Sequence, residues 1–155
     1  KSKPMRWYFL RHAKTERQAW SGKDKDRRLA PKGINQVAEL KKLLDLLPIT
    51  SIRCSSAQRT RETAMACNPL IPITFSEELY LATLDQWKRM LSNEAQDHML
   101  YIGHNDGMSE YLTWLTGEHI HLQTGALVTV DFLGSDPRAL GPGTACLIAY
   151  ERPEV

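Results

Sequence analysis

The sequence predicts an α/β fold, a three-layer α/β/α sandwich around a mostly parallel central sheet. Short apolar runs that suit buried strands alternate with longer segments whose apolar residues recur at helical spacing. This alternation is typical of helices packed on both faces of a parallel sheet. Glycine and proline residues mark most of the junctions, which supports the division into elements.

The first half of the chain predicts two strands, a long loop and two helices. Residues 5–10 form a short, aromatic-rich apolar run typical of a strand, and the polar residues 14–32 predict a loop. Apolar side chains at helical spacing predict a helix over residues 33–47, which Pro48 ends. Residues 51–54 predict a second strand and residues 57–67 a second helix, closed by Pro69.

The second half continues the alternation. Residues 72–75 predict a short strand, residues 77–80 a connection, and residues 83–91 a helix with Leu84, Trp87 and Met90 on one face. Residues 99–102 predict an apolar strand and residues 107–115 a helix. Two further apolar runs, residues 126–132 and 145–150, predict the last strands.

The composition fits one globular domain, which we expect to span residues 1–155. Apolar residues make up 42% and charged residues 25% of the chain, values that exclude a disordered, collagen-like or coiled-coil protein. Twenty basic and 18 acidic side chains leave a formal charge of +2, too small to indicate nucleic-acid binding. We expect no membrane span and no signal peptide, because every apolar stretch is short.

The three cysteines, Cys54, Cys67 and Cys146, form neither a disulfide framework nor a metal-binding pattern. We therefore expect a reducing cytoplasm as the compartment, and no metal or cofactor. The oligomeric state stays open from sequence, with a monomer as the simplest expectation.

Three of the predicted strands end in side chains suited to anion chemistry. Arg11 and His12 follow the first strand, Arg59 lies just beyond the second, and His104 and Asn105 follow the fourth. Ligands of such sheets bind at the carboxyl ends of the strands, so we expect these residues to meet.

Two guanidinium groups and two imidazoles around one point indicate a receptor for a dianion. Arg59 also lies in the first turn after Ser55 and Ser56, where free backbone N–H groups favour an anion. Phosphoryl transfer needs an in-line nucleophile and positive groups on the spectator oxygens. A neutral histidine can attack phosphorus while the arginines and a protonated second histidine hold the charge.

These segments resemble the motifs of the histidine phosphatase superfamily, which has the phosphoglycerate mutase-like fold. Residues 10–13 (LRHA) resemble its first motif, residues 54–64 (CSSAQRTRETA) its second, and residues 103–105 (GHN) its third. The short chain and the RHAK opening look most like the small phosphohistidine phosphatase subgroup. Residues 26–33 resemble that subgroup's acidic-Arg-Pro-Leu stretch, although Arg28 replaces the common proline and Ala13 the usual glycine of the first motif.

The resemblance implies that His12 is the nucleophile that becomes phosphorylated. It also implies that Arg11 and Arg59 clamp the phosphoryl group and that His104 is the second histidine on it. His12 would attack as a neutral imidazole, with its tautomer fixed by a hydrogen bond, whereas His104 would serve chiefly as a cation. Arg27 and Asn105 are further expected substrate-binding residues. Water would then hydrolyse the phosphohistidine without a metal.

The general acid stays open. Members acting on sugars and alcohols use a carboxylic acid to protonate the leaving oxygen. Glu77 and Glu78 lie in the corresponding region, with Asp85 and Asp106 as further candidates, but none sits in a distinctive motif. A phosphohistidine substrate leaves as an imidazole, which departs more easily than an alkoxide, so a missing acid suits that class.

We therefore expect a metal-independent phosphatase acting on phosphohistidine or another phosphorylated group, carried by a protein or a small molecule. Two alternatives stay open: a small-molecule phosphomonoesterase with Glu77 or Glu78 as acid, and a phosphate- or phosphopeptide-binding module without turnover. A cysteine phosphatase is excluded because Thr60, and no arginine, lies six positions after Cys54. No zinc-hydrolase or P-loop motif occurs.

The polar loop carries a small basic patch. Its cations alternate with Asp24 and Asp26 and are Lys23, Lys25, Arg27 and Arg28. A solvated loop explains this pattern, with attraction of an anionic substrate as the alternative. No aromatic platform for nucleic acid is interleaved. Trp20, in the same loop, is the tryptophan that we expect to contact substrate.

Overall fold

Six strands form one mixed sheet in the order β3-β2-β4-β1-β5-β6 in a computed structural model that describes residues 4–154. Residues 1–3 and 155 of the expected domain lie outside the described residues. The strands are β1 (Met5–Arg11), β2 (Ser51–Ser55), β3 (Ile73–Ser76), β4 (Met99–Gly103), β5 (Leu127–Phe132) and β6 (Ala145–Glu151). Strands β3, β2, β4 and β1 are parallel, and β5 and β6 pair antiparallel. The prediction of a mostly parallel sheet is confirmed.

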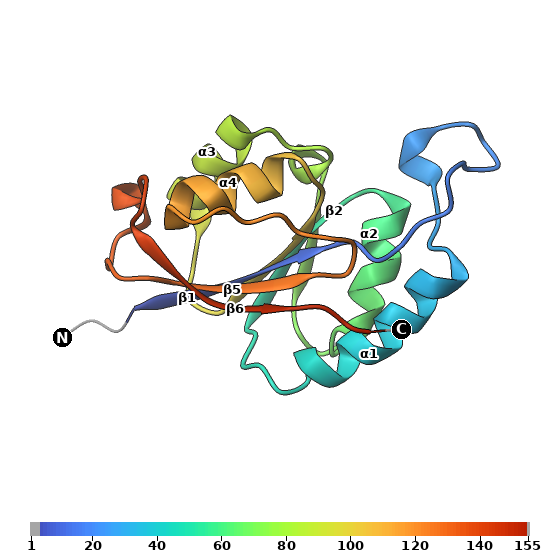
Figure 1. Cartoon of the computed structure of the whole chain (residues 1–155), viewed down its shortest axis with the longest axis horizontal. Coiled ribbons are helices and arrows are strands. Elements are labelled where there is room, and N and C mark those ends of the chain that lie inside the picture. The colour runs from blue at the N-terminus through green and yellow to red at the C-terminus, as the bar shows by residue number, and fades with distance from the viewer. Residues whose placement is uncertain (1–3, 155) are drawn as a thin grey trace.

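Helices cover both faces of this sheet (Figure 1). They are α1 (Pro31–Leu44), α2 (Gln58–Thr63), α3 (Leu84–Glu94) and α4 (Gly107–Thr116). Successive side chains of β1 point to opposite faces. Phe9 therefore packs on Trp87 of α3, with ring centroids 5.9 Å apart, whereas Leu10 belongs to the core on the other face with Leu40 of α1. These three layers confirm the predicted sandwich.

Two helix boundaries differ from the prediction. Helix α1 begins at Pro31, because proline suits the first helical turn, where its missing N–H costs nothing. It ends at Leu44, since the chain tightens into i→i+3 turns, with Leu46 N–H donating to Leu43 O, before Pro48 is reached. The helix expected over residues 57–67 is α-helical to Thr63 and continues as a 3₁₀ turn, Ala64–Ala66.

The carboxyl ends of β1, β2 and β4 lie side by side, because Arg11 pairs with Gly103 and Cys54 with Ile102. Two glycines let neighbouring segments close in on this edge. A Cβ on Gly33 would lie 2.0 Å from the Lys14 carbonyl oxygen, and one on Gly107 would lie 1.8 Å from that of Ala82. Only glycine permits these approaches, so α1 and α4 both begin against the segments that frame the site.

The polar loop predicted over residues 14–32 projects from the body beside α2 (Figure 1). It contains a β-bridge between Thr15 and Leu29 and a 3₁₀ turn, Asp24–Asp26. The Leu29 N–H donates to Glu62 of α2, which fixes the returning end of the loop. None of the helices within residues 4–154 combines the length and apolar character that crossing a membrane requires.

Candidate active site

A cavity of about 320 Å³ opens at the carboxyl ends of β1 and β4. It is polar, and it brings together every residue predicted to act on the phosphoryl group except the candidate acids. Its lining residues are Arg11, His12, Lys14, Thr15, Asp24, Arg27, Arg59, Leu81, His104, Asn105 and Thr124.

His12 presents one free ring nitrogen. Its Nδ1 lies 2.8 Å from the Ala13 carbonyl oxygen, which can only accept, so the ring proton is on Nδ1 and Nε2 keeps its lone pair. Burial lowers the pKa of His12 to about 3, and Arg59 and Arg11 act in the same direction. The imidazole is therefore neutral at pH 7, as a nucleophile must be.

His104 follows β4 and is held by Ser55 at the end of β2. Its Nε2 lies 2.7 Å from the Ser55 hydroxyl oxygen, which also accepts a hydrogen bond from the Ala57 N–H. The hydroxyl can donate its own proton to Nε2, and we assign this arrangement, which places the His104 proton on Nδ1. That Nδ1 is buried and has no partner among the described residues.

Burial, together with the positive charge of the neighbouring Arg59, lowers the pKa of His104 to about 2. The ring is therefore neutral in this structure, whereas the sequence suggested a histidine used chiefly as a cation. A phosphate dianion would raise this pKa, but the Nδ1–H tautomer can donate to an oxyanion without that protonation.

The two arginines are anchored at their ends and leave Nε unused. Arg11 donates from Nη1 to the Leu122 carbonyl oxygen at 3.0 Å, and burial lowers its pKa. Arg59 is buried and donates from both Nη atoms to Asp24. In both residues Nε is buried without a partner among the described atoms. Together with His104 Nδ1, this leaves three buried donors unsatisfied on residues that line one cavity.

Asp24 lines the cavity and contacts Arg59, a position that the sequence did not predict. Its carboxylate accepts from Arg59 Nη2 at 3.0 Å, Arg27 Nη1 at 3.0 Å and the Tyr80 hydroxyl at 2.5 Å. Hydrogen bonds from Tyr80 and Arg27, with the charge of Arg59, lower its pKa to about 2 against the opposing effect of burial. Asp24 is therefore ionised at neutral pH, and its carboxylate accepts a hydrogen bond from the Arg59 guanidinium. Asp26, its neighbour in the expected motif, accepts from Ser21 instead.

Arg27 and Asn105 lie where the sequence placed them. Arg27 lines the cavity and also donates to Thr15 and to the Glu16 carbonyl oxygen. The Asn105 amide donates to Leu122 O, and its oxygen accepts from Ser109. The Leu122 carbonyl oxygen thus accepts hydrogen bonds from both Asn105 and Arg11.

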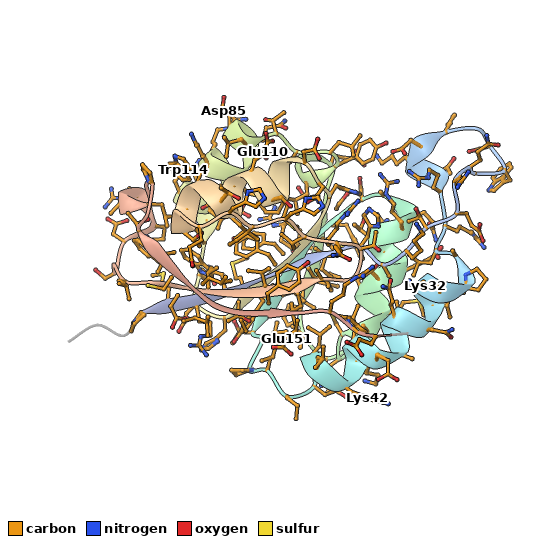
Figure 2. All side chains as sticks on the ribbon, viewed as in Figure 1. Lys32, Lys42, Asp85, Glu110, Trp114 and Glu151 are labelled. Atoms are coloured by element: carbon orange, nitrogen blue, oxygen red, sulfur yellow. The ribbon has the colours of Figure 1, made fainter. Side chains whose placement is uncertain are left out.

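Neither Glu77 nor Glu78 lines the cavity. Both are exposed, and Glu77 forms an ion pair with Lys25 that lowers its pKa, so it is a carboxylate at neutral pH. Asp85 is exposed on the outer side of α3, where Figure 2 labels it. Asp106 lines a separate hollow beside α3 and α4.

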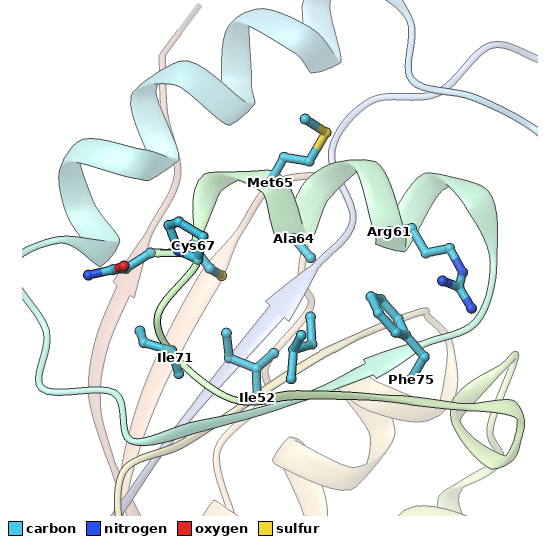
Figure 3. Close-up of a pocket in the computed structure, with 10 residues that line it drawn as sticks. Ile52, Arg61, Ala64, Met65, Cys67, Ile71 and Phe75 are labelled. Carbon is cyan, nitrogen blue, oxygen red and sulfur yellow. The ribbon is translucent and has the colours of Figure 1, made fainter.

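Another hollow, of about 340 Å³, lies between α2 and the edge strand β3 (Figure 3). Its wall is mostly apolar, and the Arg61 guanidinium lies 4.0 Å from the centre of the Phe75 ring at its rim. Burial raises the pKa of the Cys54 and Cys67 thiols to about 12, which removes any thiolate at neutral pH. Neither of these two thiols is therefore suited to act as a nucleophile.

Within residues 4–154, no group of three His, Cys, Asp or Glu side chains is arranged to hold a metal ion. The cavity is instead lined by cations, with Asp24 as its one carboxylate. This set of side chains suits a polyanionic ligand.

Comparisons with known proteins agree with this geometry. A comparison with curated protein sequences found no match. Among solved structures, a protein assigned as the phosphohistidine phosphatase SixA from Nakamurella multipartitia is 23% identical, with a TM-score of 0.83 and 99% of both chains covered. One assigned in the same way from Agrobacterium tumefaciens is 25% identical, with a TM-score of 0.82 over 98% of this chain and 100% of that chain.

A third structure, the protein histidine phosphatase SixA complexed with tungstate, is 18% identical, with a TM-score of 0.75 over 96% of this chain and 97% of that chain. The family model for the histidine phosphatase superfamily (branch 1) matches residues 7–129, a span that includes all three strand-end motifs. The chain therefore belongs to the histidine phosphatase superfamily.

Proposed function

We propose that this chain is a phosphatase that hydrolyses the P–N bond of phosphohistidine, or of a related phosphoramidate, through a phosphorylated His12. One observation carries the proposal. The neutral His12, with Nε2 unprotonated, lines the same cavity as three residues with unsatisfied buried donors, Arg11, Arg59 and His104. A nucleophile beside a preformed oxyanion receptor is what phosphoryl transfer to a histidine requires.

The reaction takes place in two displacements. His12 Nε2 attacks phosphorus, a new N–P bond forms, and the P–N bond to the substrate imidazole breaks with its electron pair moving to the leaving nitrogen. The substrate ring is protonated on its other nitrogen, so it leaves as a neutral imidazole. Arg11, Arg59 and His104 donate to the spectator oxygens, whose charge they stabilise. Water then attacks phospho-His12, releasing inorganic phosphate and restoring the imidazole. We propose no role for a metal ion or a cofactor in either displacement.

The chemistry of the leaving group favours phosphohistidine over an alkyl ester. An alkoxide needs a proton donor, and the carboxylate in the cavity, Asp24, has its pKa lowered to about 2. Glu77 lies outside the cavity and is paired with Lys25. An imidazole that is protonated on its other ring nitrogen leaves as a neutral molecule and needs no carboxylic acid. The likeness in fold to proteins assigned as SixA supports the same choice.

We place the enzyme in a reducing compartment, the cytoplasm, because Cys54, Cys67 and Cys146 are all free thiols. Its substrate is a phosphorylated protein or a small phosphorylated molecule. A monomer is sufficient for the mechanism, since one chain supplies every group that the mechanism uses.

The test compares kcat/KM for a phosphohistidine peptide, p-nitrophenyl phosphate and a sugar phosphate. We expect the phosphohistidine peptide to be the best substrate. A preference for alkyl esters that is lost in Glu77→Gln or Glu78→Gln would support the phosphomonoesterase instead. Binding of phosphate without turnover of any of the three would support a binding module.

A further inference from the structure

The long loop engages its two central acids and leaves two of its cations unpaired. Asp24 accepts a hydrogen bond from Arg59, and Asp26 accepts one from the Ser21 hydroxyl at 2.7 Å. Arg17 and Lys23 are exposed and take part in none of the ion pairs found among residues 4–154. Residues 17–23 contain no acidic side chain, so the surface that they form is cationic.

This surface contains a hollow of its own, of about 390 Å³. Its polar lining includes Arg17, Gln18 and Lys23, and it shares Asp24 and Arg27 with the catalytic cavity. The Arg27–Asp24 ion pair therefore borders both hollows, and a substrate that extends past this pair reaches the second hollow. A phosphoryl group alone does not reach it, so the hollow can serve only a larger substrate.

Trp20 lies in sequence between Ala19 and Gly22, which line this hollow, and it is 90% exposed. Tryptophan and arginine are among the residues enriched in the hot spots of protein interfaces. The loop is also preorganised, because Arg27 bonds to Asp24, Thr15 and Glu16 O, and Lys25 pairs with Glu77. A fixed surface loses less conformational entropy on binding.

We propose that residues 17–23 form a docking surface for acidic residues that flank the phosphohistidine in a polypeptide substrate. The proposal rests on the proposed function and names its substrate class as an acidic phosphoprotein segment. Arg17 and Lys23 pair with the acidic side chains, and Trp20 packs on the segment. A nucleic acid fits less well, because the Asp24 carboxylate, at the junction of the two hollows, repels an unbroken row of phosphates.

The experiment uses two phosphohistidine peptides of equal length, one flanked by three glutamates and one by three lysines, with phosphoimidazole as a substrate that has no flanking residues to contact residues 17–23. For the unaltered protein we expect a lower KM for the glutamate peptide. Arg17→Glu with Lys23→Glu should raise that KM at least about tenfold and change kcat/KM for phosphoimidazole far less, because phosphoimidazole lacks the carboxylates that pair with these two side chains.

Lys41→Glu with Lys42→Glu is the control matched in charge, since both lysines lie in the last turn of α1 and Lys42 marks the end of that helix remote from the loop (Figure 2). It also reverses two positive charges, and we expect both peptides to keep their KM. If the loop variant and this control behave alike, or if the two peptides have equal KM on the unaltered protein, the docking surface is refuted.

A binding experiment separates this proposal from the proposed function. The glutamate peptide without phosphate is titrated while tryptophan fluorescence is followed. We expect a change that is absent in Trp20→Phe and that weakens as salt is added. Failure to hydrolyse phosphoimidazole would refute the proposed function while this titration still reports docking. A titration without any Trp20 signal, with phosphoimidazole hydrolysed normally, would refute the docking surface alone.

Discussion

His12 and His104 have the same tautomer and opposite tasks. Their rings lie 5.4 Å apart, centroid to centroid. The Ala13 carbonyl oxygen takes the Nδ1 proton of His12 and leaves an unprotonated Nε2 as nucleophile. Ser55 bonds Nε2 of His104 and leaves its Nδ1–H as donor. Neutral imidazoles can thus supply both the attacking atom and an oxyanion contact.

Ser55→Ala tests this assignment of the His104 proton. Without the hydroxyl, Nε2 loses its donor, and the neutral ring no longer has to carry its proton on Nδ1. We expect kcat/KM for phosphohistidine to fall roughly tenfold, the effect of one lost hydrogen bond. The ¹⁵N NMR shifts of His104 should change from the Nδ1–H pattern to a mixture of tautomers.

Ser55→Thr, which keeps the hydroxyl, should restore most of the activity, and Ser56→Ala is the neighbouring control. If His104 already shows a protonated Nε2 in the unaltered protein, the assignment is wrong.

Residue types at strand ends could be predicted from sequence, whereas contacts between distant segments could not. Arg11, His12, Arg59 and His104 stand out because reactive side chains follow apolar runs directly. Asp24 does not, because its position against Arg59, 35 residues away, depends on how the long loop folds back.

The 3₁₀ turn Asp24–Asp26 is the element that holds the loop over the cavity. Asp24 bonds Arg59 and Tyr80, and Lys25 pairs with Glu77. Arg59 is therefore bonded to a carboxylate, and we expect an entering phosphoryl group to compete with Asp24 for the same guanidinium. The position of the loop and the binding of the phosphoryl group therefore both depend on the Arg59 side chain.

Asp24→Asn measures this competition. The amide keeps the size of the side chain but removes the negative charge from the cavity, so inorganic phosphate should bind more tightly. We expect its inhibition constant to fall about threefold to tenfold, the effect of removing one partly exposed like charge.

Glu77→Gln is the control for the loop, because it removes the other ion pair of the turn and lies outside the cavity. Its inhibition constant should equal that of the unaltered protein. A weaker affinity for phosphate in Asp24→Asn would mean that Asp24 orients Arg59 and does not compete for it.

Whole-molecule stability should depend on pH through the two buried histidines. The pKa of His12 is lowered to about 3 and that of His104 to about 2, from an ordinary value of 6.5. Between about pH 6.5 and 3 the unfolded chain therefore binds protons that the folded chain does not. The free energy of unfolding should fall as the pH is lowered through this range.

Urea unfolding at about pH 7 and pH 4.5 measures the effect, with the double variant His12→Asn and His104→Asn as comparison. The double variant should lose less stability on acidification. If both proteins show the same dependence, the two imidazoles are not buried in their neutral form.

At the scale of the whole molecule, the sequence predicted the secondary structure best. Apolar runs located the six strands to within a residue or two. The signal was strongest for β1, β4 and β5, which are buried on both faces and have a nearly continuous apolar sequence. The ends of α1 and α2 were less predictable, since they depend on turns such as Leu46 to Leu43. The order of the strands, which places β2, β4 and β1 side by side, follows from packing that sequence patterns do not encode.

The proposed mechanism requires that the phosphoryl group be transferred to His12 before it reaches water. This intermediate can be trapped by rapid quenching of the enzyme during turnover of a phosphohistidine peptide, followed by peptide mass spectrometry at neutral pH. We expect one phosphoryl group on the peptide that contains His12, and we expect His12→Ala to lose both this phosphoryl group and all turnover. Undiminished hydrolysis by His12→Ala, or a phosphoryl group trapped on any other residue, would show that His12 is not the nucleophile.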